Sequence, residues 1–499
     1  MTRREFLTTG AAFASRSAFA GRNVFAATEK RPRLKFGVLS DIHVMRSGLD
    51  EKISEEGNTL TLRRALEWFR DQGVDAVVIT GDIADRGNDI NLAAVAEAWY
   101  SVYPNDRLPD GRKVEKLFIT GNHDWCGDTD AHNEKLWPDR GERMKHVLRA
   151  DMAGWWEKAF HEAYEPIWRK EVNGYAFIGC NWDTTGGYPF GRIKEWMEQN
   201  GRSLDPAMPF FYLQHPHLRD TCYGPWAWGR DKGVATETLS AFPNAIALSG
   251  HSHYPLTDER TVWRGAFTSA GCSSLRYQNS NYDEFPPAGF ENWTGGGGKE
   301  GWRANANKFL KKLYCGDSRQ GMLWSVYDGE ITIKKREFLA NADIGRDWVL
   351  PLGAEKRHLA ALTERAKKFR APEFAEGAEL KIERVRAKNR GGRQRNGPGI
   401  VEAVEQDGFK VVAPPVVKDD AARAQFYEFA AVRPDGTRIV KRVLPPSFHH
   451  AAANWRKMKE PVFCIFGKGE LGEGDVRFKV AAVNSLGAKG EALESRIEG

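Results

Sequence analysis

Short apolar runs alternate with amphipathic segments over the first two thirds of the chain. Residues 34–39 form the first apolar run, and residues 57–72 place apolar side chains three or four positions apart before Gly73. A short apolar run between polar residues is typical of a buried strand, whereas the wider spacing is typical of a helix. The same reasoning predicts strands over 75–80, 116–120, 176–180, 210–213 and 245–248, and helices over 90–103 and 140–170.

Strands that alternate with helices are typical of an α/β fold in which helices cover a sheet. An Asp-Gly pair between two alternating runs predicts a β-hairpin over 325–333. Residues 279–308 lack periodicity and contain four consecutive glycines, so we expect a long loop there that acts as a lid. We assign residues 34–338 to a single α/β domain.

The pattern changes after this domain. Residues 339–374 include a charged helical segment over 355–370 that ends before Pro372, and we interpret them as a connector. Residues 375–499 contain short alternating runs separated by Gly, Pro and Asp turns, which predicts a small all-β sandwich. Within it, the run 476–487 resembles one strand pair of fibronectin type III or immunoglobulin-like domains.

Composition narrows the class of protein. The chain has 499 residues, of which 41% are hydrophobic, and its 73 Lys and Arg exceed its 67 Asp and Glu by six. Such a chain can bury large cores, so disorder and collagen-like structure are excluded. The small positive surplus predicts no nucleic-acid partner, and the absence of an 18-residue apolar run predicts no membrane span. The oligomeric state is left open.

The N-terminus has the pattern of an export signal. Arg3-Arg4 is followed by x-Phe-Leu and a weakly apolar stretch, and residues 18–20 and 24–26 offer cleavage sites of the small-x-small type. The arginine pair resembles a twin-arginine signal. We therefore expect residues 1–27 to be an export signal and the mature protein to be periplasmic or secreted. The alternative is an amphipathic start with a chance arginine pair.

Five of the predicted strands end in residues that bind metal ions in proteins. In chain order the motifs are Asp-x-His, Gly-Asp, Gly-Asn-His-Asp, a single His, and Gly-His-x-His. Ligands gather beyond the carboxyl ends of strands in open α/β sheets, so we expect these motifs to converge on one rim. Carboxylate, imidazole and amide donors without Cys suit Mn, Fe or Zn. The candidate residues are Asp41, His43, Asp82, Asn122, His123, Asp124, His215, His251 and His253.

A single His or Asp after a strand is usually structural, but the ordered set of five motifs is specific. It resembles the calcineurin-like metallophosphoesterase superfamily over about residues 34–338. The resemblance implies a β-sandwich flanked by helices, with two divalent metal ions on one rim. It assigns one ion to Asp41, His43, Asp82 and His253, and the other to Asp82, Asn122, His215 and His251, with Asp82 bridging.

The same resemblance implies a mechanism. A hydroxide shared by the two metal ions attacks phosphorus in line, while the ions neutralise charge on the phosphoryl oxygens. His123 protonates the departing alkoxide as the general acid, and Asp124 orients His123. The expected reaction is hydrolysis of a phosphodiester bond, with a secreted phosphomonoesterase as the alternative.

Two positions depart from known branches of the superfamily. Purple acid phosphatases have Tyr three residues after the bridging Asp, where this chain has Asp85. Protein Ser/Thr phosphatases usually have Glu where this chain has Asp124. Both departures favour the more diverse bacterial phosphodiesterase and phosphatase branches.

The sequence identifies residues that contact the substrate less specifically than it identifies metal ligands. Trp125 and Trp226 lie close to ligand motifs and are candidates to stack a base or a sugar, although most Trp residues are expected in cores. His217 and Arg230 are candidates to contact a phosphate or a leaving group. A function of another class is a binding or adhesion protein that works through its C-terminal sandwich. The intact ligand set argues against it.

The cysteines leave two alternatives open. Cys126 and Cys222 each follow a ligand motif, so a disulfide between them is one alternative in an oxidising compartment. The other is that all six cysteines are small buried apolar residues.

Overall fold

The computed structural model describes residues 31–46, 58–229, 231–280, 313–315, 318–353, 369–388, 405–418, 423–443, 445 and 461–497. Contacts divide the chain into Met1–Arg31 and Pro32–Gly499, and all the elements named below lie in the second unit. Three predicted segments lie wholly or mostly outside the described residues: the export signal over 1–27, the loop over 279–308 and the helix over 355–370.

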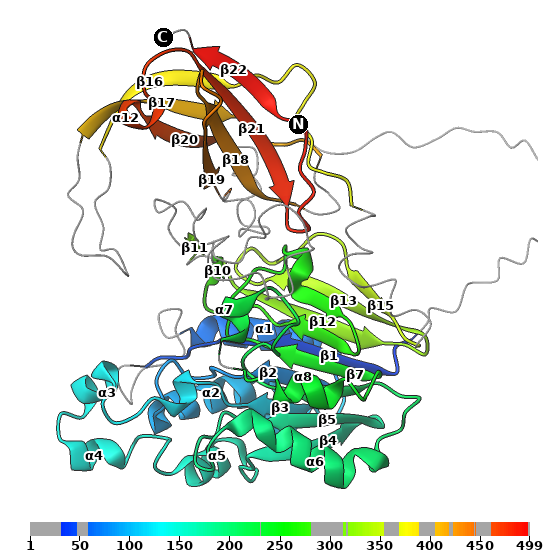
Figure 1. The fold of residues 1–499 in the computed structure, drawn as a ribbon. Coiled ribbons are helices and arrows are strands. Elements are labelled where there is room, and N and C mark those ends of the chain that lie inside the picture. The colour runs from blue at the N-terminus through cyan, green and yellow to red at the C-terminus, as the bar shows by residue number, and fades with distance from the viewer. Residues whose placement is uncertain are drawn as a thin grey trace, which may run out of the picture. The chain divides into compact units, whose positions relative to one another are not determined.

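The larger domain is built on two sheets (Figure 1). In the first sheet the strand order is β14-β13-β12-β1-β2-β3, and β15 also pairs with β13. Its strands are β1 (Leu34–Leu39), β2 (Ala76–Thr80), β3 (Glu115–Ile119), β12 (Gln320–Val326), β13 (Glu330–Glu337), β14 (Ala342–Asp343) and β15 (Trp348–Pro351). In the second sheet the order is β4-β5-β6-β7-β9-β8. Its strands are β4 (Ile167–Val172), β5 (Tyr175–Cys180), β6 (Phe210–Leu213), β7 (Ala245–Ser249), β8 (Val262–Arg264) and β9 (Thr268–Gly271).

Helices cover the outer faces of both sheets. Apolar side chains of α1, α2 and α5 pack against the first sheet, and those of α6 and α8 pack against the second. The helices are α1 (Thr59–Asp71), α2 (Asp89–Val102), α3 (Ala131–Leu136), α4 (Arg140–Met144), α5 (Met152–Phe160), α6 (Arg192–Asn200), α7 (Pro225–Trp228), α8 (Val234–Leu239) and, late in the chain, α12 (Lys468–Leu471). The predicted α/β fold, a β-sandwich flanked by helices, is confirmed.

Side-chain alternation along β1 explains why the two sheets pack face to face. Phe36 belongs to the core between the sheets and packs edge-on against Phe177 and Phe211, with ring centroids 5.4 and 5.0 Å away. Successive side chains of a strand point to opposite faces, so Gly37 faces the helices. A Cβ atom on Gly37 would lie 2.5 Å from the ring of Phe69 in α1. Glycine therefore allows this helix to pack closely on the sheet.

One predicted hairpin is confirmed and one predicted helix is partly wrong. β12 and β13 pair antiparallel around the expected turn. Residues 140–170, all described, contain α4 and α5, but the stretch ends in β4, which pairs antiparallel with β5. Asn173 and Gly174 join these strands with φ values of 50° and 82°. Two consecutive positive φ values are typical of a tight hairpin turn, and the Asn-Gly pair was the overlooked signal.

The first sheet continues past residue 338, where we expected the domain to end. β15 pairs antiparallel with β13, with Leu350 opposite Ile331. Trp348 and Leu350 both belong to the core between the two sheets. The sheet therefore extends to Pro351, because these apolar side chains complete its buried face.

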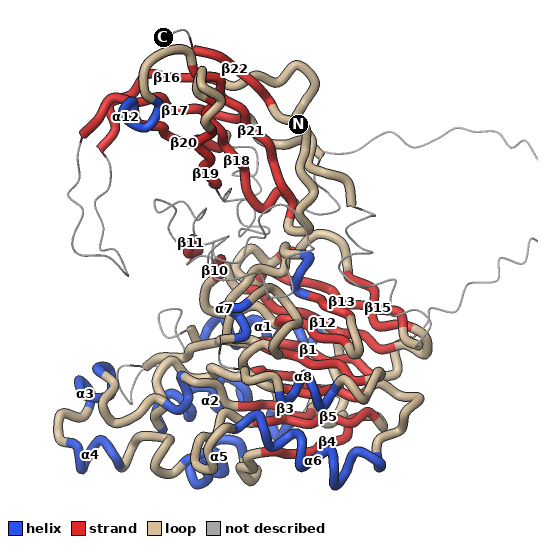
Figure 2. Tube along the Cα trace, in the orientation of Figure 1, coloured by secondary structure: helices blue, strands red, loops and turns tan. Residues whose placement is uncertain are grey.

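Residues from β16 onward form two antiparallel sheets. The strand orders are β16-β17-β20 and β19-β18-β21-β22. The strands are β16 (Lys381–Lys388), β17 (Glu405–Ala413), β18 (Ala424–Val432), β19 (Arg438–Val443), β20 (Val462–Gly467), β21 (Val476–Asn484) and β22 (Leu493–Ile497). Val411 and Phe466 from one sheet and Phe429 and Phe478 from the other share a single core. Figure 2 shows strand and loop in the described part of this region, with α12 as its helix. The all-β sandwich is confirmed, whereas the likeness to fibronectin type III stays a prediction.

β10 (Gln278–Ser280) pairs with β11 (Leu313–Cys315) in a separate two-stranded sheet. Among the helices of the described residues, none has both the length and the hydropathy needed to cross a membrane.

Candidate metal centre

The predicted metal ligands and the predicted general acid, His123, follow the carboxyl ends of parallel strands. β1, β2 and β3 run parallel, and so do β5, β6, β7 and β9. The residues beyond these ends are Asp41 and His43 after β1, Asp82 after β2, Asn122 and His123 after β3, His215 after β6, and His251 and His253 after β7. Apart from Asn122, these residues form three overlapping groups, and the ligand atoms within each group lie within 4.8 Å of one another: Asp41, His43 and His253; His43, Asp82 and His123; and Asp82, His215 and His251.

The backbone at these residues is strained. Left-handed φ values are found at Asp41 (49°), His43 (49°), Asp82 (49°), His251 (69°) and His253 (57°). This conformation costs a residue other than glycine on the order of 1 kcal/mol or more, and such residues cluster at functional sites. The cost is offset here by the hydrogen bonds and packing that fix each loop, which indicates that the positions of these side chains matter.

Two glycines make room for the ligands. A Cβ atom on Gly81 would lie 2.5 Å from Nδ1 of His215, and one on Gly121 would lie 2.3 Å from Oδ1 of Asp82. Gly81 also has a φ of 99°, which glycine adopts without strain. Any side chain at either position would displace a ligand residue.

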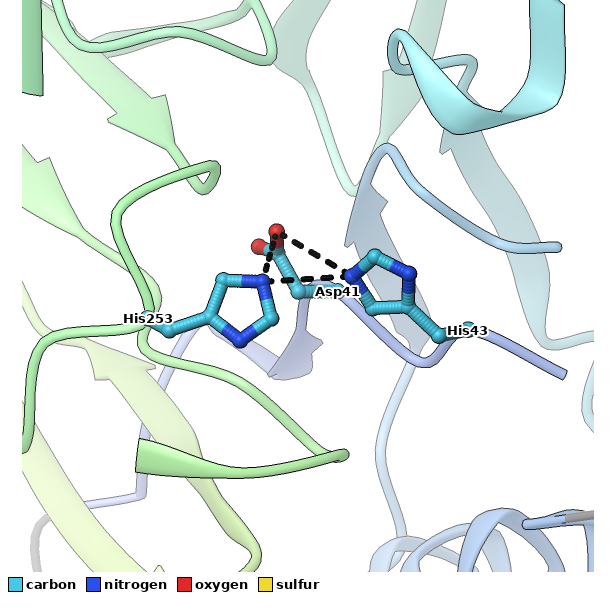
Figure 3. A group of neighbouring side chains, drawn as sticks. All are labelled: Asp41, His43 and His253. Atoms are coloured by element: carbon cyan, nitrogen blue, oxygen red, sulfur yellow. Dashed lines mark hydrogen bonds and ion pairs between the residues drawn. The ribbon is translucent and has the colours of Figure 1, made fainter. Parts of the chain in front are cut away.

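The first group contains Asp41, His43 and His253 (Figure 3). Nε2 of His253 lies 3.0 Å from Oδ1 of Asp41 and 3.1 Å from Nε2 of His43. The other ring nitrogens are occupied, because Nδ1 of His43 donates to Oδ1 of Asp85 at 2.9 Å and Nδ1 of His253 donates to the carbonyl of Tyr277 at 3.2 Å. The two Nε2 atoms therefore face each other and a carboxylate, and they are the ring atoms left to bind a cation. A proton on one ring balances this arrangement in the metal-free protein, and a divalent metal ion fits the same position.

The second group contains Asp82, His215 and His251. Nδ1 of His215 donates to the carbonyl of Thr80 at 2.7 Å, which leaves Nε2 as the ring atom that faces Oδ2 of Asp82, 3.1 Å away. Asn122 follows β3 and directly precedes His123. Its Oδ1 atom is buried and accepts no hydrogen bond from any residue that the structure describes. A buried amide oxygen without a hydrogen-bond donor is also suited to a metal ion.

Asp82 lies between the two groups. Its Oδ2 atom is 3.1 Å from Nε2 of His215 and 3.7 Å from Nε2 of His43. Its Oδ1 atom accepts a hydrogen bond from the backbone N–H of His123 at 2.8 Å, which fixes the carboxylate plane. This is the placement that a bridging ligand requires.

The ionisation of these groups follows from their burial together. Burial alone would lower the pKa of His43, but Asp41, Asp85 and Asp82 raise it to about 10. Burial would also lower the pKa of His215, and Asp82 raises it to about 9. Burial would raise the pKa of the Asp41 and Asp82 carboxyls, but the imidazoles outweigh it and lower both. Both carboxylates are therefore ionised at neutral pH and able to bind cations.

Asp85 contacts two histidines of the site and was not among the predicted functional residues. Besides accepting from His43, it lies beside His123, whose Nδ1 is 2.9 Å from the Asp85 carbonyl and 3.7 Å from Oδ1. The rings of His43 and His123 pack edge to face, with centroids 4.6 Å apart. The sequence feature that could have identified Asp85 is its position three residues after Asp82, in a loop bounded by glycines at 81 and 87.

The expected contact between Asp124 and His123 is not found. Within the described part of the chain, the hydrogen-bond partners of the buried Asp124 carboxylate are the backbone N–H groups of Ile83, Ala84 and Gly121, at 3.2, 2.7 and 2.7 Å. Burial and the charge of Asp82 raise the pKa of Asp124 to about 7. Asp124 thus joins the loops after β2 and β3, while Asp85 takes the place beside His123.

Two of the four predicted substrate contacts are buried instead. Trp125 is 8% exposed, packs in the core under α2 and α5, and donates from Nε1 to the hydroxyl of Thr120. His217 is fully buried, and its Nε2 lies 2.8 Å from the hydroxyl of Ser252. Neither side chain is accessible to a substrate, because both are buried among other residues of the domain. Arg230 and the side chain of Trp226 lie outside the described residues.

Three further residues border the site. The ring of Trp182, half-buried, lies 6.1 and 6.4 Å from the rings of His215 and His251. Trp182 follows β5, so a strand-end search would have found it. Arg86 forms ion pairs with Asp85 at 2.8 Å and with Asp130 at 3.0 Å. Tyr277, the third, stands 24 residues after His253 and carried no sequence signal.

The cysteine alternatives are settled for the described thiols. Among the described cysteines, Cys126, Cys180, Cys222, Cys272 and Cys464, no two are joined by a disulfide. Cys126 is half-buried and the other four are buried, so these residues act as small apolar side chains.

Comparison with known proteins agrees with this geometry. Residues 34–255 match the family model of calcineurin-like phosphoesterases (Metallophos). The chain therefore contains a calcineurin-like metallophosphoesterase domain, and it is a metal-dependent phosphoric ester hydrolase. No curated protein matches the sequence at a significant level.

Solved structures with a related fold share little sequence with this chain. A dimetal phosphatase from Danio rerio is 12% identical, with 64% of this chain and 100% of that chain covered and a TM-score of 0.36. A purple acid phosphatase from yellow lupin (Lupinus luteus) seeds is 12% identical, with 66% and 56% covered and a TM-score of 0.37. An NAD nucleotidase from Haemophilus influenzae is 12% identical, with 67% and 56% covered and a TM-score of 0.27. Similarity this low says nothing about the substrate.

Proposed function

We propose that this chain is an exported enzyme that hydrolyses phosphodiester bonds with two divalent metal ions. The observation that carries the proposal is the position of Asp82, whose Oδ2 atom lies near the imidazoles of both His43 and His215. One carboxylate between two donor groups is the arrangement by which two cations are held side by side.

The donors assign the ions to two positions. Asp41, His43 and His253 would hold one ion, Asn122, His215 and His251 would hold the other, and Asp82 would contribute to both. Nitrogen and oxygen donors without thiolates fit Mn, Fe or Zn. When bound, such ions activate water and neutralise charge on phosphoryl oxygens.

His123 is placed to donate the proton that the leaving group needs. Its side chain is 33% exposed, so a substrate can reach it, whereas the ligand imidazoles of His43 and His215 are nearly or fully buried. Nδ1 is directed at the carbonyl of Asp85, which leaves Nε2 as the atom that passes a proton to the departing oxygen. The guanidinium of Arg86, beside the ring, is suited to a phosphoryl oxygen.

The preference for diesters and the export route rest on the sequence. Asp124 stands where protein Ser/Thr phosphatases usually have Glu, which favours the bacterial phosphodiesterase and phosphatase branches. The twin-arginine pattern at Arg3-Arg4 supports export of the mature chain.

Two nitrophenyl substrates test the reaction. Chelator-treated protein is titrated with Mn²⁺ and assayed with bis-nitrophenyl phosphate and with nitrophenyl phosphate. We expect Mn²⁺-dependent hydrolysis with a higher kcat/KM for the diester, and no activity in the control Asp82→Asn. A higher kcat/KM for the monoester would make the protein a phosphomonoesterase. Activity of Asp82→Asn close to wild type would refute the two-metal site.

A further inference from the structure

A buried turn over residues 273–278 follows β9 and contacts the first ligand group. The hydroxyl of Ser274 donates to the backbone carbonyl of Asp41 at 3.0 Å. The same oxygen accepts from the backbone N–H groups of Arg276 at 2.9 Å and Tyr277 at 3.3 Å. One hydroxyl thus uses its single proton and both lone pairs to join this turn to a ligand residue from another strand.

Further bonds hold the turn in place. The N–H of Leu275 donates to the carbonyl of Ser40 at 2.9 Å. The side chain of Gln278 donates to the carbonyl of Ser274 and accepts from the hydroxyl of Ser273, both at 2.8 Å. Ser273, Ser274, Leu275 and Gln278 are all buried. The position of Tyr277 relative to the end of β1 is therefore set by a rigid network.

Tyr277 makes two separate contacts with His253. Its carbonyl oxygen lies 3.2 Å from Nδ1 of His253, and its ring stacks on the imidazole with centroids 4.0 Å apart and planes 29° apart. The ring also lies 6.3 Å from that of His43, in a similar orientation. The carbonyl selects the tautomer with the proton on Nδ1, and the stacked ring restrains rotation of the imidazole.

We infer that Tyr277 is a positioning residue of the first metal site: its carbonyl and ring together hold Nε2 of His253 toward Asp41, ready to bind a divalent cation. The inference rests on the proposed two-metal function. A histidine ligand normally donates its second N–H to a fixed acceptor, and loss of such support typically weakens metal binding 10–100-fold. Here a residue that is distant in sequence provides both the acceptor and the restraint.

The domain offers a matched control. Tyr100 also stacks on a histidine, His161, with centroids 5.0 Å apart and planes 24° apart, and its hydroxyl donates to the carbonyl of Phe160. Neither Tyr100 nor His161 contacts a candidate ligand. If a tyrosine–histidine stack served packing alone, Tyr277→Leu and Tyr100→Leu would have similar effects.

The test measures Mn²⁺ binding rather than activity. Chelator-treated wild type, Tyr277→Phe, Tyr277→Leu and Tyr100→Leu are titrated with Mn²⁺ by calorimetry, and electron paramagnetic resonance reports whether one or two ions are bound. We expect Tyr277→Leu to weaken one of the two binding steps about 10–100-fold. Tyr277→Phe, which keeps the ring, and Tyr100→Leu should bind both ions as wild type does.

The outcomes separate this inference from the proposed function. Wild-type affinity for both ions in Tyr277→Leu would overturn the inference and leave the two-metal enzyme standing. Failure of wild type to bind any Mn²⁺ would overturn both. If Tyr277→Leu does not fold, nitrogen-15 spectra of wild-type histidines decide: the proton of metal-free His253 is expected on Nδ1, and its presence on Nε2 would overturn the inference.

Discussion

The carboxylate of Asp85 accepts a hydrogen bond from Nδ1 of His43 at 2.9 Å. The carbonyl of the same residue lies 2.9 Å from Nδ1 of His123. One residue therefore orients both a ligand of the first group and the candidate general acid, so that metal binding and proton donation depend on the same short loop.

Asp85→Ala should weaken binding of the first metal ion about 10–100-fold, because Nδ1 of His43 loses its acceptor and the ring is no longer fixed. Calorimetric titration with Mn²⁺ measures the change. Asp89→Ala is the control, since Asp89 lies 3.0 Å from Nδ1 of His146 in an equivalent pair away from the site. Equal affinities in both variants would show that the Asp85 side chain does not support the metal.

His123→Asn should leave metal content near wild type and lower kcat according to the leaving group. General acid catalysis is typically worth about 10²–10⁴-fold, and it matters most when the departing alkoxide is basic. An alkyl ester should therefore lose far more activity than a nitrophenyl ester, whose anion leaves unaided. Steady-state kinetics on both substrates give the two ratios. Equal losses for both would remove His123 from this role.

Asp124→Ala should act mainly on stability. Three buried backbone N–H groups lose their acceptor, each at a cost of about 1–3 kcal/mol, so the free energy of unfolding should fall by about 3 kcal/mol or more. Urea unfolding measures this. The ratio of alkyl to nitrophenyl activity in any remaining folded enzyme should match wild type. A stable variant that selectively loses activity on alkyl esters would instead show that Asp124 orients His123.

Glu337 should make stability depend on pH. Burial is the main cause that raises its pKa from 4.5 to about 7, although Ser318 and the N–H groups of Arg319 and Leu339 donate to it. The folded state thus binds the proton more tightly than the unfolded chain does. Its contribution to stability is complete below about pH 4.5 and is lost as the pH rises to about 7, by on the order of 3 kcal/mol.

Glu337→Gln removes this titration, so the variant should gain stability relative to wild type between about pH 5 and pH 8. Urea unfolding at a series of pH values measures the difference between the two proteins. Glu330→Gln, on the same strand, controls for a glutamine in β13. A difference between Glu337→Gln and wild type that stays constant with pH would contradict the prediction.

Replacement of Arg3 and Arg4 by Lys should trap the precursor in the cytoplasm if the twin-arginine route is used. Cell fractionation followed by immunoblotting compares the double variant with wild type. Replacement of Arg31 and Arg33 by Lys, beyond the expected cleavage sites, is the control and should leave export unchanged. Normal recovery of the Arg3/Arg4 variant in the periplasm would rule out this route.

Motifs at the ends of predicted strands are enough to show which residues gather at the site. Asp41, Asp82 and His215 follow apolar runs, and parallel strands bring their carboxyl ends to a common edge, so strand-end motifs are enough to predict their proximity. The α/β sandwich followed from the same periodicity. These features are local, because a strand and the residue that follows it are adjacent in the chain.

The support of these residues depends on contacts between segments that are far apart in the chain. Trp125 and His217 are buried, Asp124 binds backbone N–H groups, and Asp85 and Tyr277 orient the imidazoles. The direction of a side chain and the identity of its partner depend on how loops from different strands pack together. Tyr277 reaches His253 only because β7 and β9 are hydrogen-bonded neighbours, a relationship that the spacing of the two residues along the chain does not contain.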